Sequence, residues 1–269
     1  MTLPFPRSDV TESLKLVGLL AGLAIVAVVG AYDDARELKP LPQFIAQFLA
    51  AGIAVASGVV IGRVPNPFGG DIELLWLALP FTVFWIVGMM NTVNWLDGLD
   101  GLAAGVTVIA SAVLCLHTFR LEQFSLTLLP LALAGAALGF LLFNFPPAKI
   151  FLGAGAPLLG FALGVLSIIG GAKVATALLA LAIPILDVAW QILTRVRAGR
   201  SPFAADRGHL HHRLYDFNIA PRAIVALYYA LSAAFGALAL ILPSGVYKLI
   251  ALLVIGAGAL AVLIRLRRS

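Results

Sequence analysis

Apolar runs long enough to cross a membrane recur along almost the whole chain. About nine of them, each of roughly 14–21 residues, occur between residues 14 and 264. They lie at 14–31, 43–61, 73–92, 100–118, 126–143, 157–171, 174–193, 223–242 and 246–264. Hydrophobic residues make up 61% of the sequence and charged residues 12%, which is too apolar for a soluble domain. Because the runs show no sustained apolar–polar alternation, we expect an all-α fold, a polytopic helical membrane protein with about nine transmembrane helices.

The sequence predicts a single membrane domain without internal linkers. A polar segment, 1–13, precedes the integral-membrane domain, 14–264, and a basic tail, 265–269, follows it. Further spans follow the first run, so we interpret that run as a membrane helix rather than a secretory signal. Cys115 is the only cysteine and lies in an apolar run, which excludes an intrachain disulfide.

Lysine and arginine are unevenly distributed between the two sides of the predicted membrane. If the segment after the first run is cytoplasmic, 12 of the 18 basic residues lie on the cytoplasmic side. They are Arg36, Lys39, Lys149, Arg195, Arg197, Arg200, Arg207, Arg213, Arg222, Arg265, Arg267 and Arg268. This orientation places the segments 32–42, 93–100, 144–156 and 194–222 inside. The pI near 9.7 then reflects this bias and contact with anionic lipid, and we expect no nucleic-acid partner.

The junction after the third run carries an ordered polar motif, NTVNWLDGLDG. Asn94, Asp97 and Asp100 follow at three-residue intervals, so on a helix they would line one face. Gly98 and Gly101 allow a backbone or ligand to approach closely, and either one opens or caps the fourth helix. Oxygen ligands of this kind suit Mg²⁺, which takes one or two carboxylates and completes its shell with water and substrate phosphates. The alternative is a capped interhelical turn, where these residue types are common.

A second acidic pair, Asp33-Asp34, ends the first run on the same predicted side. Adjacent carboxylates repel each other, so a site that keeps both ionised needs a cation or strong donors. The alternative is a solvated helix end, with Arg36 and Lys39 as screening partners.

The segment 194–222 is rich in arginine and histidine. Arginine side chains match phosphate oxygens, and histidine can donate to a diphosphate or act near neutral pH. The segment supplies both types, with Arg200, Arg207, Arg213, His209, His211 and His212. The HxHH string also suits zinc, but no cysteine cluster or second histidine cluster completes such a site. An inert solvated basic loop is the other alternative. Asp187, shortly before this segment, is expected to bond to Arg195 or to a neighbouring helix.

Together these residues predict a Mg²⁺-dependent site for a diphosphate-bearing substrate at the cytoplasmic membrane surface, with Mn²⁺ as an alternative cation. Phosphoryl transfer depends mainly on positioning and charge neutralisation, which such residues supply. A secondary transporter that couples ions through membrane carboxylates is a weaker hypothesis, because the acids lie at helix ends on one side rather than near the midplane.

Four motifs in order resemble the polyprenyl-phosphate N-acetylhexosamine-1-phosphate transferases: YDDARELKP, NTVNWLDGLDGLAAG, NFPPAKIFLGAGAPLLGF and GRSPFAADRGHLHHRL. The resemblance extends from about residue 16 to the C-terminus. It is strongest to the bacterial branch that starts O-antigen, teichoic-acid or related cell-wall glycans. It implies transfer of a sugar-1-phosphate from UDP-N-acetylhexosamine (UDP-HexNAc) to undecaprenyl phosphate, with release of UMP. It also implies an inner-membrane location with a cytoplasmic active site, and allows a homo-oligomer.

The resemblance also implies roles for individual residues. Asp33 and Asp34 match the catalytic acidic pair, assigned to the lipid phosphate or to metal. Asn94 and Asp97 match the metal motif, and Asp100 lies near the diphosphate. The other substrate-binding positions implied are Lys149, Arg200, Arg207, His209, His211 and His212.

The sequence departs from the family pattern in two places. After AKIF, members carry FLGD followed by a small residue and Gly, but Gly153 is followed here by Ala154, so the aspartate, a metal ligand, is absent. Members also have about two further N-terminal helices and a His…Pro-Arg-x-Gly-Gly loop before the position where this sequence begins. We expect weaker Mg²⁺ and substrate binding, and a relative that binds lipid phosphate or nucleotide sugar without turnover is the alternative.

Overall fold

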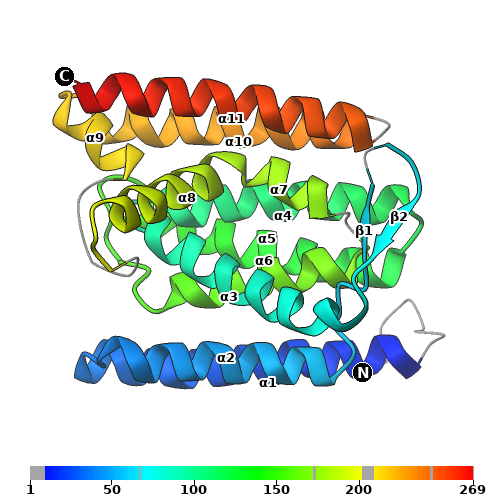
Figure 1. Cartoon of the computed structure of the whole chain (residues 1–269). Coiled ribbons are helices and arrows are strands. Elements are labelled where there is room, and N and C mark those ends of the chain that lie inside the picture. Colours follow the sequence, from blue (N-terminus) through cyan, green and yellow to red (C-terminus); the bar gives the residue numbers. More distant parts are fainter. Residues whose placement is uncertain (1–9, 67, 172–173, 202–208, 243–244, 269) are drawn as a thin grey trace.

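The computed structural model describes residues 10–66, 68–171, 174–201, 209–242 and 245–268, and helices dominate it (Figure 1). The α-helices are α1 (Val10–Arg36), α2 (Pro40–Ala56), α3 (Ala78–Leu96), α4 (Leu102–Arg120), α5 (Phe124–Asn144), α6 (Gly155–Ile169), α7 (Val174–Ala180), α8 (Ala182–Arg197), α9 (Leu210–Asp216), α10 (Pro221–Ile241) and α11 (Gly245–Arg268). A short antiparallel hairpin, β1 (Arg63–Pro65) and β2 (Asp71–Glu73), and a 3₁₀ turn, η1 (Leu75–Leu77), join α2 to α3.

The helices form three layers in Figure 1. The antiparallel pair α1 and α2 lies on one side, α10 and α11 lie on the other, and α3 to α8 fill the space between them. The β-hairpin lies at one end of the bundle and α9 at the other. Since α1 and α3 both run from the hairpin end, their C-terminal ends meet at the end where α9 lies.

Within the residues that the structure describes, five helices are long and apolar enough to cross a bilayer, which fits a multi-pass helical membrane protein. They cover Thr11–Arg36, Leu75–Leu96, Leu102–Arg120, Phe124–Asn144 and Pro221–Ile241. Three shorter apolar helices, at Pro40–Ala56, Gly155–Ile169 and Gly245–Gly258, accompany them. The expected count of nine transmembrane helices therefore stays a prediction.

Several predicted boundaries are wrong in detail. The run 174–193 is interrupted at Leu181, where α7 gives way to α8. The run 73–92 begins with β2 and η1, and the sequence did not indicate the hairpin in GRVPNPFGGD. The segment 194–222, expected as a loop, contains the end of α8 and the whole of α9.

The centre of the bundle is packed closely enough to hold the helix ends in fixed positions. Met90 on α3 and Phe161 on α6 are fully buried, and the ring of Phe161 packs against Gly22 of α1. At Gly160 a Cβ would lie 2.5 Å from the carbonyl oxygen of Met89, so only glycine allows these two helices to pack at this distance. This contact holds α6 against the end of α3 that carries Asn94 and Asp97.

Candidate active site

An acidic pocket of about 330 Å³ lies among the C-terminal ends of α1 and α3 and the start of α6. Its polar lining comes from Asp33, Asp34, Gln43, Gln47, Asn94 and Asp97, together with the backbone around Gly153 and Ala154. The structure therefore brings together two motifs that lie some sixty residues apart in sequence. Carboxylates from both motifs surround one cavity.

Asp33 is held in place by two hydrogen bonds. The backbone N–H of Leu38 donates to Oδ1 across 2.7 Å, and Nε2 of Gln43 donates to Oδ2 across 2.9 Å. Asp33 is half-buried, so the alternative of a freely solvated helix end does not describe it. These donors restrain the carboxylate on the pocket wall.

Asp34 is exposed and faces the turn that precedes α6. The backbone N–H of Ala154 donates to its Oδ1 across 3.2 Å. A Cβ built on Gly153 would lie 3.0 Å from the same oxygen. The position at which the sequence lacks the FLGD aspartate therefore lies directly against Asp34.

Asn94 and Asp97 lie at the end of α3, which stops at Leu96 with Asp97 as its C-cap. Burial, and then the nearby charge of Asp100, raises the pKa of Asp97 to about 6. Both effects disfavour the ionised carboxylate, and a bound cation would oppose both. Near and below pH 6 a cation bound here would therefore compete with a proton for the Asp97 carboxylate.

The expectation that Asn94, Asp97 and Asp100 line one helical face is wrong. The helix ends before Asp100, and residues 97–101 form a turn that leads into α4, with Gly101 as the N-cap. Asp100 does not line the acidic pocket; its Oδ2 accepts the backbone N–H of Ala148 across 2.9 Å. Asp100 therefore joins two motifs, and its role in substrate binding stays a prediction.

Asn144 forms a second link between the same two motifs. Its Oδ1 accepts the N–H of Gly101 across 2.9 Å, and its Nδ2 donates to the carbonyl of Ile150 across 2.9 Å. Asn144 is 2% exposed, and its bond to Gly101 is buried, whereas its bond to Ile150 is only partly buried. From the other side, Tyr229 donates its hydroxyl to the carbonyl oxygen of Gly101 across 2.5 Å.

His209, His211 and His212 lie together at the start of α9, next to the end of α3, and are called the histidine turn below. His209 is stacked with His211 at 5.7 Å between ring centroids, and His211 lies 4.3 Å from His212. A Cβ on Gly98 would lie 2.2 Å from Nε2 of His211, so this ring packs directly on the glycine that follows Asp97. Burial, followed by the charges of His212 and His209, lowers the pKa of His211 to about 3, which keeps it neutral at pH 7.

The other predicted residues lie apart from the pocket lining. Lys149 and Arg200 are exposed, Lys149 on the turn after α5 and Arg200 after α8. Arg207 lies outside the residues that the structure describes. The substrate-binding role of all three stays a prediction.

Residues 16–171 match the family model described as glycosyl transferase family 4. The chain belongs to this family. It is 34% identical over 245 residues to a probable undecaprenyl-phosphate N-acetylglucosaminyl 1-phosphate transferase of Bacillus subtilis (strain 168), an alignment that covers 88% of this chain and 68% of that protein. It is 33% identical over 260 residues to a decaprenyl-phosphate N-acetylglucosaminephosphotransferase of Mycolicibacterium smegmatis, with 84% of this chain and 63% of that protein covered.

A shorter part of the chain is similar to a third protein. A phospho-N-acetylmuramoyl-pentapeptide-transferase of Listeria innocua is 44% identical over 100 residues, which cover 37% of this chain and 31% of that protein. The chain spans roughly two thirds of the length of the Bacillus and Mycolicibacterium relatives.

The donor set of this family member fits Mg²⁺ held in part by substrate. Within the described residues, no three His, Cys, Asp or Glu side chains lie close enough together to hold a metal by themselves. Mg²⁺ does not need such a cage, because it typically uses one or two carboxylates and takes its other ligands from water and phosphates. Asp97, with Asn94 and the Asp33-Asp34 pair around the same cavity, meets this smaller requirement.

Sequence reasoning missed two glutamines on α2. Gln43 holds Asp33, and Oε1 of the buried Gln47 accepts a hydrogen bond from Nδ2 of Asn91 across 2.7 Å. The signal was present, since QFIAQF places the two amides four residues apart, on one face of an otherwise apolar helix.

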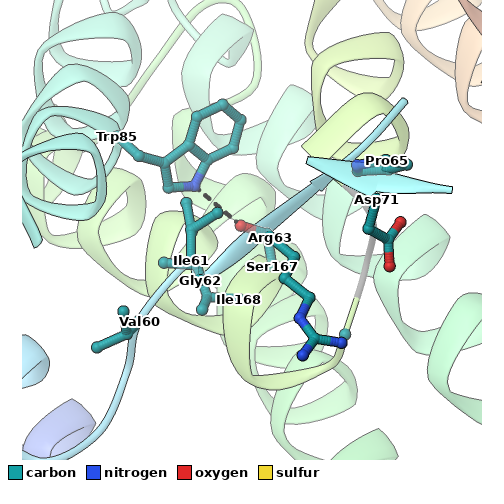
Figure 2. A pocket seen from close by; sticks show the side chains of 10 residues that line it. Val60, Ile61, Gly62, Arg63, Pro65, Asp71, Trp85, Ser167 and Ile168 are labelled. Carbon is teal, nitrogen blue, oxygen red and sulfur yellow. Dashed lines mark hydrogen bonds between the residues drawn. The ribbon is translucent and has the colours of Figure 1, made fainter. Parts of the chain in front are cut away.

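A second cavity, of about 270 Å³, lies at the hairpin end of the bundle (Figure 2). Its inward polar groups are already paired: Nε1 of Trp85 donates to Oγ of Ser167 across 3.1 Å. Arg63 on its rim forms an ion pair with Glu73 at 3.2 Å, and both side chains are largely exposed. This cavity lacks the converging carboxylates of the acidic pocket.

Proposed function

We propose that this chain transfers N-acetylhexosamine-1-phosphate from UDP-HexNAc to undecaprenyl phosphate, with release of UMP, as a membrane step of cell-envelope glycan synthesis. The active site lies at the cytoplasmic face and uses Mg²⁺, or Mn²⁺ in its place. The observation that carries the proposal is the acidic pocket, where Asp33, Asp34, Asn94 and Asp97 surround one cavity at helix ends. The names of the Bacillus and Mycolicibacterium relatives support the lipid phosphate and the N-acetylglucosamine phosphate.

In the proposed reaction, an oxygen of the lipid phosphate attacks the phosphorus that bears the sugar. A new P–O bond forms, the P–O bond to UMP breaks, and UMP leaves with the electron pair. When the lipid phosphate enters as a monoanion, a carboxylate of the Asp33-Asp34 pair accepts its proton. Asp33 is suited to this because the donors Leu38 and Gln43 hold its orientation.

The residues around the pocket position the two substrates. Asp97 and Asn94 line the pocket, where they would face the diphosphate, and the histidine turn packs on Gly98 beside them. Mg²⁺ bound at these oxygens would supply neutralising charge for the diphosphate and the departing UMP. His209, His211 and His212, with Arg207 and Arg200 upstream, would border the nucleotide diphosphate.

The experiment that tests this function measures UMP release by membranes that contain the chain. The membranes receive UDP-N-acetylglucosamine, undecaprenyl phosphate and Mg²⁺, and a parallel sample carries Asp97→Asn. We expect UMP release that requires both the lipid phosphate and Mg²⁺ and that falls sharply in the variant. Membranes carrying an Asp97→Asn/Asp33→Asn double variant serve as the blank.

Two results would change the proposal. Release that is unaffected by Asp97→Asn would place the reaction elsewhere. Mg²⁺-dependent binding of UDP-N-acetylglucosamine without any UMP release would identify a family member that binds but does not turn over, as the missing FLGD aspartate allows.

A further inference from the structure

Asp187 lies in the middle of α8 and is 4% exposed. A buried carboxylate is strongly destabilising unless it is hydrogen-bonded, so its partners indicate why it is there. Both carboxylate oxygens of Asp187 make hydrogen bonds to the same short segment, residues 209–210. Oδ2 lies 3.0 Å from Nδ1 of His209, and Oδ1 accepts the backbone N–H of Leu210 across 2.8 Å.

These two contacts determine the orientation of the His209 ring. Because an ionised carboxylate only accepts hydrogen bonds, the ring proton facing it is on Nδ1. The side chain of His209 is 7% exposed, and its ring also lies 6.1 Å from that of Trp95 and stacks on His211. Asp187 on α8 therefore holds the ring of His209 in one orientation.

His211 connects the contacts of Asp187 to the acidic pocket. This fully buried ring packs on Gly98, and Gly98 directly follows Asp97. Neither ring nitrogen of His211 has a hydrogen-bond partner within the described part of the chain. The ring is thus held by packing, and its place depends on where α9 begins.

We infer that Asp187 is a positioning residue for the proposed transfer: through His209 and the amide of Leu210 it holds the histidine turn against the Asp97-Gly98 turn. This inference rests on the proposed function. The sequence-based expectation gave Asp187 a bond to Arg195 or to a neighbouring helix, and the bond to Leu210, the first residue of α9, confirms the second of these. The guanidinium of Arg195 lies over the ring of Trp95, at 5.7 Å from the ring centroid.

The test compares variants of the full-length chain, purified in detergent, for their affinity for UDP in the presence of Mg²⁺. Asp187→Ala removes both contacts, whereas Asp187→Asn keeps an acceptor for the N–H of Leu210. The matched control is Thr82→Val, at the hairpin end of α3. Thr82 is fully buried and accepts the N–H of Ile61 across 2.9 Å, so this variant also loses a buried hydrogen bond.

We expect Asp187→Ala to weaken UDP binding at least tenfold and Asp187→Asn to recover part of that loss. Thr82→Val should lose thermal stability and keep its UDP affinity. Because Asp187 acts in part through His209, the two losses should not multiply in full: a double variant, Asp187→Ala/His209→Ala, should bind UDP more tightly than the product of the two single losses predicts. Hydrogen exchange of the backbone at 210–216 should rise in Asp187→Ala and not in Thr82→Val.

The outcomes separate the inference from the function on which it rests. If Asp187→Ala binds UDP as tightly as the unmodified chain, or if its effect multiplies with that of His209→Ala, Asp187 is not a positioning residue. An equal loss of affinity in Thr82→Val would also overturn the inference, because it would show a general effect of lost stability. An unmodified chain that binds neither UDP nor UDP-N-acetylglucosamine with Mg²⁺ would instead refute the proposed function.

Discussion

Ala154 donates its backbone N–H to Oδ1 of Asp34 across 3.2 Å, at the point where family members are expected to carry the FLGD aspartate. A main-chain donor thus contacts Asp34 where a second carboxylate would otherwise lie. A carboxylate at that place would repel Asp34 and increase the need for a cation. This chain therefore has less negative charge around the pocket.

Insertion of one aspartate between Gly153 and Ala154 should strengthen Mg²⁺ binding. Because hard-cation sites are tuned by the number of charged ligands, we expect a gain of roughly tenfold or more in affinity. The measurement is a Mg²⁺ titration of the purified protein, followed by thermal stabilisation. Insertion of alanine at the same place is the control, since it shifts the backbone equally without a ligand. A gain of the same size with alanine would show that backbone register, and not charge, limits binding.

Binding of Mg²⁺ should weaken as pH falls through the pKa of Asp97, which is about 6. Below that pH the carboxyl holds a proton that the cation must displace, so the affinity should fall by about tenfold for each pH unit. Above it the carboxylate is free and the affinity should level off. Titrations between pH 5 and 8 check this, and Asp97→Asn should bind weakly with a flat profile. A profile in Asp97→Asn that matches the unmodified chain would assign the proton to another group.

The membrane class and the acidic pocket could largely be predicted from the sequence. Asp33-Asp34 and Asn94-Asp97 each lie at the end of a long apolar run on the side with most basic residues, so a shared site was expected. The pocket lining contains all four residues. The pattern of apolar runs with acidic residues at their ends was sufficient for this prediction, because each run extends over most of a helix.

The position of Asp100 could not be predicted in the same way. Three-residue spacing predicts a common face only while the helix continues, and α3 ends at Leu96. The turn that follows is stabilised by Asn144, which lies more than forty residues along the chain, and local sequence does not contain that contact. The pairing of Asp187 with His209 was unpredictable for the same reason, since α8 and α9 meet only through tertiary packing.

Gly98→Ala should disturb the histidine turn. The added Cβ would lie 2.2 Å from Nε2 of His211, so α9 or the end of α3 must move, at a cost of about 1–3 kcal/mol in stability. UMP release and UDP affinity should both fall. Gly88→Ala, on the helix α3 that precedes this turn, is the control, because its Cβ would meet nothing within 4 Å. Thermal unfolding and UDP binding of the two variants check the prediction, and equal behaviour would contradict the packing of His211 on Gly98.

Asn144→Ala should destabilise the protein, because it removes the joint between the 97–101 turn and the turn after α5. The buried N–H of Gly101 would lose its partner, which costs about 1–3 kcal/mol, while the partly buried bond to the carbonyl of Ile150 adds less because water can replace it. Asn144→Asp should recover only the acceptor for Gly101, and it brings a negative charge to the turn that holds Asp100. Thermal unfolding in detergent measures both effects.

Asn66→Ala is the control for Asn144→Ala, because Asn66 accepts the N–H of Phe68 across 3.0 Å in an exposed loop at the hairpin end. Water replaces that bond when it is lost, so the melting temperature of the Asn66→Ala variant should differ little from that of the unmodified chain. If Asn66→Ala and Asn144→Ala melt at the same temperature, the bonds of Asn144 are replaced as easily as an exposed bond. The turn that carries Asp97 would then be held mainly by Tyr229 and by the pairing of Asp100 with Ala148.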